Sequence, residues 1–162
     1  MKQQELLDNR NKWIKALLDP STRKATGVLE EIDSSGKVLG RCCLGTGCSA
    51  LGVKRIVGDM KNVGYYNAKD EHTYVFKDNS EYAECFSQEF ANLVGLYDKE
   101  GYRGDYNCPE KTEITIRQHK SPCLSSLNDE TEITPQEIGQ YLRTVIQGGK
   151  KTPFKPLKEY SE

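Results

Sequence analysis

The sequence predicts an α+β fold, in which a small, mainly antiparallel sheet packs against an N-terminal and a C-terminal helix. Amphipathic helical periodicity appears near both ends of the chain, and β-prone runs between them each need one face buried. The 162 residues fall within the size of one domain. We place that domain at residues 1–149, followed by an extended C-terminal tail over 150–162 that contains two prolines.

The first predicted element is a helix from about Glu5 to Leu18. Its apolar residues recur at three- and four-residue spacing on one side, and they are Leu6, Leu7, Trp13, Ile14, Leu17 and Leu18. Asp19-Pro20 ends the helix, because the residue before a proline is pushed out of the α region. Trp13 lies on the apolar stripe, so we expect it to pack in the core.

A hairpin is predicted next. Residues 27–32 and 37–42 are β-prone, and Asp33-Ser34-Ser35-Gly36 between them is a turn-forming cluster. A short helix then fits Cys43 to Lys54, where Leu44, Cys48 and Leu51 fall at helical spacing. From Gly58 to Ser80 no period is sustained, and short strands or an ordered loop fit equally well.

The second half of the chain predicts two further elements before its last helix. A helix is expected from about Glu84 to Val94, with Gly95 placed as the left-handed residue that ends it. Thr112 to Arg117 alternates polar and apolar residues, which indicates a strand with Ile114 and Ile116 towards the core.

The last predicted helix has the clearest start. Thr134, Pro135 and Glu137 supply the N-cap, the first helical position and the acid of a capping box. The apolar stripe that follows consists of Ile138, Tyr141, Leu142, Val145 and Ile146. Gly148-Gly149 is expected to stop the helix.

The charge pattern and the apolar runs exclude several classes of protein. The net charge is −1, and an acidic middle over residues 61–137 separates two mildly basic ends. Coating nucleic acid requires a concentrated basic face, so we do not expect a nucleic-acid partner. The apolar runs are too short for a membrane helix, and the N-terminus lacks the features of a signal peptide. We therefore expect a cytoplasmic protein whose six cysteines are reduced.

Four groups of residues carry a resemblance to a known set of proteins. They are Arg10-Asn11-Lys12-Trp13, Cys42-Cys43-Leu44-Gly45 followed by Cys48, Gly95-Leu96, and Leu127-Asn128-Asp129 leading into Ile138. With these boxes the chain resembles small uncharacterised proteins of phages and prophages, although Thr46-Gly47-Cys48-Ser49 replaces a more apolar segment that ends in an acid. The resemblance implies a phage accessory role in the host bacterial cytoplasm. We expect Asn128-Asp129 to be a structural loop, since both residue types bond to nearby backbone amides.

The candidate ligand site surrounds Gly45-Thr46-Gly47. A glycine turn of this kind presents amide donors to an anion, and Arg41, Lys54 and Arg55 are close enough in sequence to add positive charge. The hairpin would deliver Arg41, and the short helix would bring Lys54 and Arg55 back past the turn. The motif lacks the third glycine of a dinucleotide fingerprint and the ending of a P-loop. A tight turn beside solvated basic residues is the alternative interpretation.

The cysteines raise the question of a metal site, but their spacing in the sequence is unfavourable for one. Cys42, Cys43 and Cys48 could join His119 and Cys123 around a metal ion. Adjacent cysteines do not chelate one ion easily, however, and the paired spacing of structural zinc sites is absent from the sequence. We therefore predict no metal and no other cofactor, and we interpret these cysteines as small apolar residues of a packed core turn.

The function predicted from the sequence is a non-enzymatic phage accessory protein, with counter-defence as one such role. It would bind a host protein or sequester a small anionic ligand such as a nucleotide, and the sequence leaves a homo-oligomer open. The alternative is a thiol-dependent enzyme that uses Cys43 or Cys48. Such an enzyme needs a base, and neither histidine, His72 or His119, lies in a recognisable catalytic motif.

Overall fold

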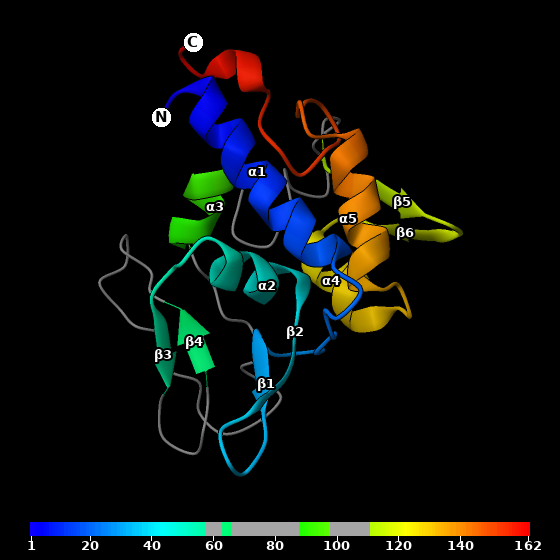
Figure 1. The fold of residues 1–162 in the computed structure, drawn as a ribbon. Helices are drawn as coiled ribbons and strands as arrows, with labels where there is room; N and C mark the ends of the chain where they lie inside the picture. Colours follow the sequence, from blue (N-terminus) through cyan, green and yellow to red (C-terminus); the bar gives the residue numbers. More distant parts are fainter. Residues whose placement is uncertain (58–62, 66–87, 98–110) are drawn as a thin grey trace.

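The computed structural model describes residues 1–57, 63–65, 88–97 and 111–162, and its class is α+β, as the sequence predicts (Figure 1). In chain order its elements are α1 (Gln3–Leu18), β1 (Glu30–Ile32), β2 (Val38–Arg41), α2 (Cys43–Ala50), β3 (Arg55–Val57), β4 (Val63–Tyr65), α3 (Gln88–Val94), β5 (Ile114–Ile116), β6 (His119–Ser121), α4 (Leu124–Glu130), α5 (Pro135–Thr144) and η3, a 3-10 turn (Leu157–Glu159). None of the helices in the described ranges combines the length and the apolar character needed to cross a bilayer.

The strands pair differently from the single small sheet that the sequence predicts. Within the described ranges they form three separate antiparallel pairs, β1 with β2, β3 with β4 and β5 with β6. Each strand has only three or four residues and therefore presents few side chains to a neighbour. The buried residues of the first and third pairs include Glu30, Gly40, Ile114 and Ser121. In Figure 1 the β1–β2 and β3–β4 pairs lie next to each other below α2, and the β5–β6 pair lies beside α5.

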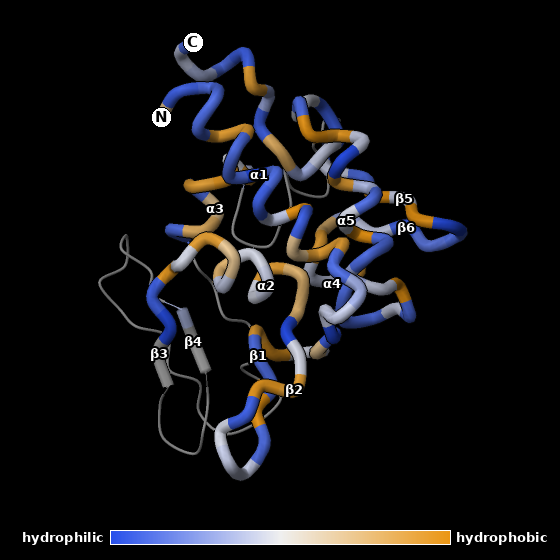
Figure 2. Tube along the Cα trace, in the orientation of Figure 1, coloured by the Kyte–Doolittle hydropathy of each residue, from blue (hydrophilic) through white to orange (hydrophobic). Residues whose placement is uncertain are grey.

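Helix α1 is central to the packing of the core. Its buried side chains are Leu6, Arg10, Trp13, Ile14 and Leu17. It contacts α2, α3, α5 and η3, and in Figure 1 it passes between α3 and α5. Asp19 is its C-cap and leaves the helical conformation with ψ 125°, as expected of the residue before Pro20. Figure 2 shows hydrophilic and hydrophobic residues interspersed along α1, whereas α2 runs from white to orange.

Trp13 confirms the prediction that it packs in the core. Its side chain is fully buried, and its ring meets those of Phe90 and Phe154 edge-on at centroid distances of 4.9 and 5.9 Å. Its indole Nε1 donates a hydrogen bond of 2.9 Å to the carbonyl oxygen of Cys43, at the start of α2. One side chain thereby connects α1 with α2, α3 and the C-terminal segment.

The C-terminal segment, residues 150–162, folds back onto the core, which differs from the extended tail predicted from its prolines. Phe154 is fully buried and Leu157 nearly so. The backbone N–H of Gln3 donates to the carbonyl of Ser161 at 2.8 Å, and Figure 1 shows the two chain ends side by side. Pro153 and Pro156 interrupt helical structure. They do not prevent the apolar residues between and after them from being buried.

The capping predicted for the last helix is confirmed. Thr134 accepts from the Glu137 backbone N–H while the Glu137 side chain accepts from the Thr134 backbone, and Pro135 begins α5. Within its stripe, Ile138 and Leu142 are fully buried, whereas Tyr141, Val145 and Ile146 are partly buried. The helix ends at Thr144, with Val145 as C-cap, a few residues before the glycine pair that was expected to stop it.

Of the other predicted elements, the short helix, the helix before Gly95 and the strand over Thr112 to Arg117 are present, whereas α4, β3 and β6 were not predicted. The short helix ends at Ala50, earlier than predicted, so Lys54 follows it instead of forming part of it. Gly95 has φ +68° and ends α3 as predicted, while residues 84–87 of that predicted helix lie outside the described residues. Of the segment 58–80 only residues 63–65 are described, and they form β4. The rest of that segment lies outside the described residues.

Candidate functional site

The predicted glycine turn is part of a buried helix. Gly45, Thr46 and Gly47 lie within α2, where the Gly45 amide donates to the Cys42 sulfur at 3.3 Å and the Thr46 amide to the Cys42 carbonyl at 2.9 Å. A methyl group at Gly45 would lie 2.1 Å from the carbonyl oxygen of Leu29. The glycines therefore permit close helix packing, and these two amides are used inside the fold instead of facing an anion.

Two of the predicted basic residues meet at Glu30. The Nε atoms of Arg41 and Arg55 donate to the Glu30 carboxylate at 3.1 and 2.7 Å, and the hydroxyl of Tyr65 donates to it at 2.8 Å. The Glu30 side chain is 0% exposed, whereas those of Arg41 and Arg55 are 31% and 38% exposed. We call these four residues the Glu30 cluster. Lys54 lies exposed, just before Arg55.

The Glu30 cluster carries one net positive charge. Burial acts to raise the pKa of Glu30, but the hydrogen bonds from Arg55 and Tyr65 and the charge of Arg41 outweigh burial and hold the pKa below its ordinary value. Glu30 is therefore ionised at neutral pH beside two guanidinium groups. Burial, followed by the bond to Glu30, raises the pKa of Tyr65, so its hydroxyl keeps its proton.

A hollow of about 340 Å³ lies next to the Glu30 cluster, between the end of α1, the loop that follows it, β2 and the second half of α2. Its charged lining residues are Asp19, Arg23 and Arg41. Its hydroxyl-bearing lining residues are Ser21, Thr22, Thr46 and Ser49, and its apolar ones are Ala16, Val38, Leu39 and Ala50. Arg41 and Thr46 thus belong to the hollow, whereas the other four predicted site residues do not line it.

The loop that contributes Arg23 is held against β2 by backbone hydrogen bonds. The Arg41 amide donates to the Arg23 carbonyl and the Ala25 amide to the Arg41 carbonyl, each at 3.0 Å. The Asp19 carboxylate accepts from the amide and hydroxyl of Ser21, at 2.8 and 2.7 Å, which lowers the pKa of Asp19. The loop is therefore ordered by the contacts between Asp19 and Ser21 and by the backbone bonds to β2, and these backbone bonds place Arg23 beside Arg41 in the lining of one hollow.

Sequence reasoning missed three residues of this region. Glu30 had only a partial signal, because a regular hairpin centred on residues 33–36 would pair it with Leu39. The observed register, with its shift between Glu31 and Ile32, brings it opposite Arg41 instead. A carboxylate opposite an arginine is a favourable cross-strand pair. Arg23 and Ser21 follow Pro20 in a segment without periodicity, and their meeting with β2 depends on contacts distant in sequence.

The four cysteines within the described ranges are buried, and Cys42, Cys43 and Cys48 pack in the core as predicted. Cys43 and Cys48 are 0% exposed. Burial raises the pKa of Cys42 to about 12 and also raises that of Cys43. Thiolate, the reactive form, is therefore suppressed at Cys43. Within the described ranges, no group of three or more His, Cys, Asp or Glu side chains could hold a metal ion, and His72 lies outside those ranges.

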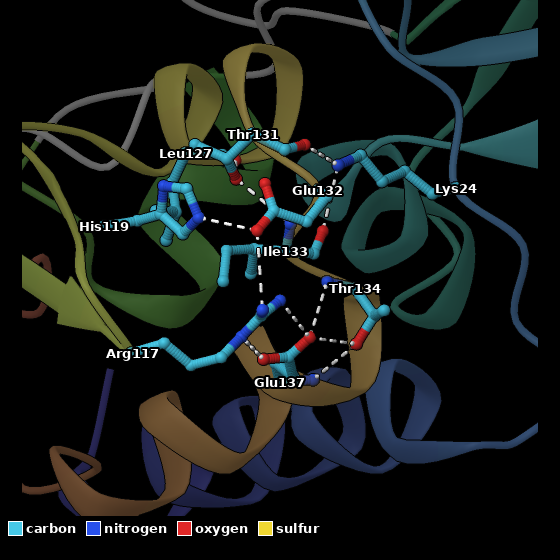
Figure 3. Close-up of polar contacts among 9 residues, drawn as sticks. All are labelled: Lys24, Arg117, His119, Leu127, Thr131, Glu132, Ile133, Thr134 and Glu137. Atoms are coloured by element: carbon cyan, nitrogen blue, oxygen red, sulfur yellow. Dashed lines mark hydrogen bonds and ion pairs between the residues drawn. The ribbon is translucent and has the colours of Figure 1, made fainter.

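A second polar cluster joins the β5–β6 hairpin to the connection between α4 and α5 (Figure 3). His119 Nε2 lies 2.8 Å from Glu132 Oε1, and Arg117 donates to Glu137 at 2.7 and 3.1 Å. On the other side of the connection, Lys24 Nζ donates to the carbonyls of Thr131 and Ile133. The Glu132 side chain is 62% exposed. These pairs hold the connection in place, and surface pairs of this kind contribute little to stability.

The Asn-Asp box also has a structural role, although it lies in α4 and not in the predicted loop. Asn128 is fully buried. Its side-chain oxygen accepts from the Cys43 amide at 3.1 Å, and its side-chain nitrogen donates to the carbonyl of Ala25 at 2.9 Å. The backbone of Gly27 in turn donates to Asp129 at 3.0 Å. Asn128 and Asp129 thereby hold the start of α2 and the segment that connects the loop of the hollow to β1.

Comparison with known proteins adds no relative from which a role could be transferred. No family model matches the chain, and neither a curated protein nor a solved structure matches it. The resemblance to phage proteins therefore stays a prediction from the four residue boxes.

Proposed function

We propose that this protein is a non-enzymatic binding protein that sequesters a small anionic ligand, a phosphate ester such as a nucleotide, in the hollow between α1, α2 and β2. The observation that supports this most strongly is the pairing of Arg23 and Arg41, from two segments joined by backbone hydrogen bonds, in the lining of one hollow. A volume of about 340 Å³ lies at the lower end of the range found for small-molecule sites.

The lining offers the chemistry that a phosphate ester needs. Guanidinium groups bind phosphate oxygens through charge-assisted and often bidentate hydrogen bonds. Ser49 adds a hydroxyl to the same lining, and a hydroxyl can donate to a phosphate oxygen. The hydroxyls of Ser21 and Thr46 instead donate within the fold, to Asp19 and to the carbonyl of Cys42. Leu39, which is 47% exposed, and the neighbouring apolar residues offer a surface to the uncharged part of the ligand.

Sequestration fits the hollow better than catalysis by a thiol does. The sulfur atoms of Cys43 and Cys48 are buried in the core, and the raised pKa of Cys43 disfavours the thiolate that a nucleophile requires. Removing a small signalling molecule from solution requires only affinity. It would also suit the phage accessory role that the resemblance implies, in which such removal counters a host response.

Replacing Arg23 with glutamine should weaken binding of the ligand at least tenfold. Arg23 lines the hollow, is exposed and lies outside the Glu30 cluster, and its guanidinium donates to the carbonyl of Pro20 at 3.0 Å. Arg23→Gln therefore removes a positive charge from the lining without uncovering a buried charge. A hydrogen bond to a charged group is worth about 1.5–3 kcal/mol, which corresponds to at least a tenfold change in affinity. Isothermal titration calorimetry with 5′-AMP, 3′,5′-cyclic AMP and inorganic phosphate measures the effect.

Arg143→Gln is the matched control, because Arg143 is exposed on α5, outside the hollow, and its replacement changes the net charge equally. We expect Arg143→Gln to leave the dissociation constants unchanged. Ala50→Trp, which fills the hollow without changing its charge, should abolish binding. Equal effects of Arg23→Gln and Arg143→Gln, or no binding of any of the three probes to the native protein, would show that the proposal is wrong.

A further inference from the structure

We propose that Glu30 is a specificity-determining residue of this site, which selects phosphate esters with one negative charge against those with two. The inference rests on the proposed function, because it concerns the same hollow. It also requires that a residue outside the lining influences the ligand through Arg41, which both lines the hollow and contacts Glu30.

The charges around the hollow balance one negative charge on a ligand. The lining contains Arg23, Arg41 and Asp19, which together carry one net positive charge. Behind Arg41, the charge of Glu30 is offset by that of Arg55. A monoanion would therefore be neutralised in the hollow, whereas the second charge of a dianion would lose hydration without a matching cation.

Glu30 cannot turn away from Arg41 to relieve this restriction. Its side chain is 0% exposed, and both of its carboxylate oxygens accept hydrogen bonds, one from Arg55 and the other from Arg41 and Tyr65. The bond to Arg41 is 3.1 Å long, so a phosphate on the far side of that guanidinium would lie close enough to Glu30 to be repelled. Repulsion grows with ligand charge, and a dianion is therefore disfavoured more than a monoanion.

Two nucleotides that share the same base and sugar test the inference. At pH 7.5 the phosphodiester of 3′,5′-cyclic AMP carries one negative charge, and the phosphomonoester of 5′-AMP carries nearly two because its second pKa is about 6. Glu30→Gln removes the negative charge but keeps an oxygen acceptor. We expect this variant to bind 5′-AMP at least about fivefold more tightly and to improve cyclic AMP binding by a smaller factor, as Coulomb attraction requires.

Arg55→Gln supplies the opposite change and remains informative if Glu30→Gln fails to fold. Arg55 contacts Glu30 but does not line the hollow. Its replacement leaves the charge of Glu30 less compensated, so binding should weaken, and more for 5′-AMP than for cyclic AMP. If Glu30 only positions Arg41, the Glu30→Gln variant should instead bind both nucleotides more weakly, by the same factor. Circular dichroism checks that each variant is folded.

The outcomes distinguish the inference from the function on which it rests. If both nucleotides bind the native protein and each variant changes both affinities by the same factor, the hollow is a ligand site but the role of Glu30 is wrong. If neither nucleotide binds the native protein, the proposed function fails and the role of Glu30 fails with it. Opposite shifts of the 5′-AMP to cyclic AMP affinity ratio in the two variants would support the inference.

Discussion

Replacing Arg10 with methionine is expected to lower the free energy of unfolding by at least about 3 kcal/mol, since hydrogen bonds to a charged group are worth about 1.5–3 kcal/mol each. Arg10 is fully buried in α1. Its guanidinium donates to the carbonyls of Val94 at 2.8 Å, Ile146 at 2.7 Å and Lys155 at 2.8 Å. Arg10→Met keeps the apolar stem but leaves these carbonyls without their donor.

The ends of two helices explain why a buried guanidinium is tolerated at this position. Val94 is the last residue of α3, and Ile146 lies just beyond the end of α5. Carbonyls at helix C-termini carry partial negative charge, which stabilises a cation. The guanidinium also lies 4.2 Å from the centre of the Phe154 ring. Burial lowers the pKa of Arg10 to about 10, so the side chain remains charged at neutral pH.

Urea denaturation measures this prediction, with Arg143→Met as its control. Arg143 is an exposed arginine on α5, and its replacement should change the free energy of unfolding by less than about 0.5 kcal/mol. Similar losses for the two variants would contradict the assignment of Arg10 as the residue that joins α1, α3, α5 and the C-terminal segment.

Gly45→Ala should destabilise the protein by at least about 2 kcal/mol through overpacking, although alanine favours helix by about 1 kcal/mol. The added methyl group would lie 2.1 Å from the carbonyl oxygen of Leu29. That atom belongs to the backbone just before β1, so it cannot move aside as a side chain can. Relief would require α2 to shift away from the hairpin, which would disturb Arg41 and the hollow.

Gly139→Ala is the matched control, because Gly139 is also a buried glycine within a helix, α5. Its added methyl group would lie 3.1 Å from side-chain atoms of Leu17 and Leu18, which can adjust. We expect a change in the free energy of unfolding of less than about 1 kcal/mol, in either direction. Thermal and urea denaturation compare the two, and equal effects would show that α2 does not pack against Leu29 as closely as described.

Features encoded by adjacent residues could be predicted from the sequence. Asp19-Pro20 ends α1, Gly95 ends α3 with a positive φ, and Thr134 with Glu137 starts α5. Each depends on the conformational limits of a proline or a glycine, or on hydrogen bonds that span three residues. Such contacts form in the same way wherever the segment lies in the fold, so a local pattern is sufficient to identify them.

Features that depend on partners distant in sequence could not be predicted in this way. Gly45 and Gly47 have the spacing of a ligand-binding turn, and only the proximity of Leu29 and of the Phe90 ring shows that they serve helix packing. Phe154 follows a proline in a polar segment, yet it lies against Trp13. Their roles follow from the tertiary fold. For the same reason Arg41 was identified as a site residue while its neighbour in space, Arg23, was not.

The central claim, that the hollow between α1, α2 and β2 is the ligand site, is tested most directly by recording ¹H–¹⁵N spectra of the protein during titration with cyclic AMP. The account predicts that the largest shift changes fall on residues 21–23, 38–41, 46, 49 and 50, which line the hollow, and that they saturate with one dissociation constant. Changes confined to the β5–β6 hairpin and the connection between α4 and α5, or spectra that stay constant at millimolar nucleotide, would contradict it.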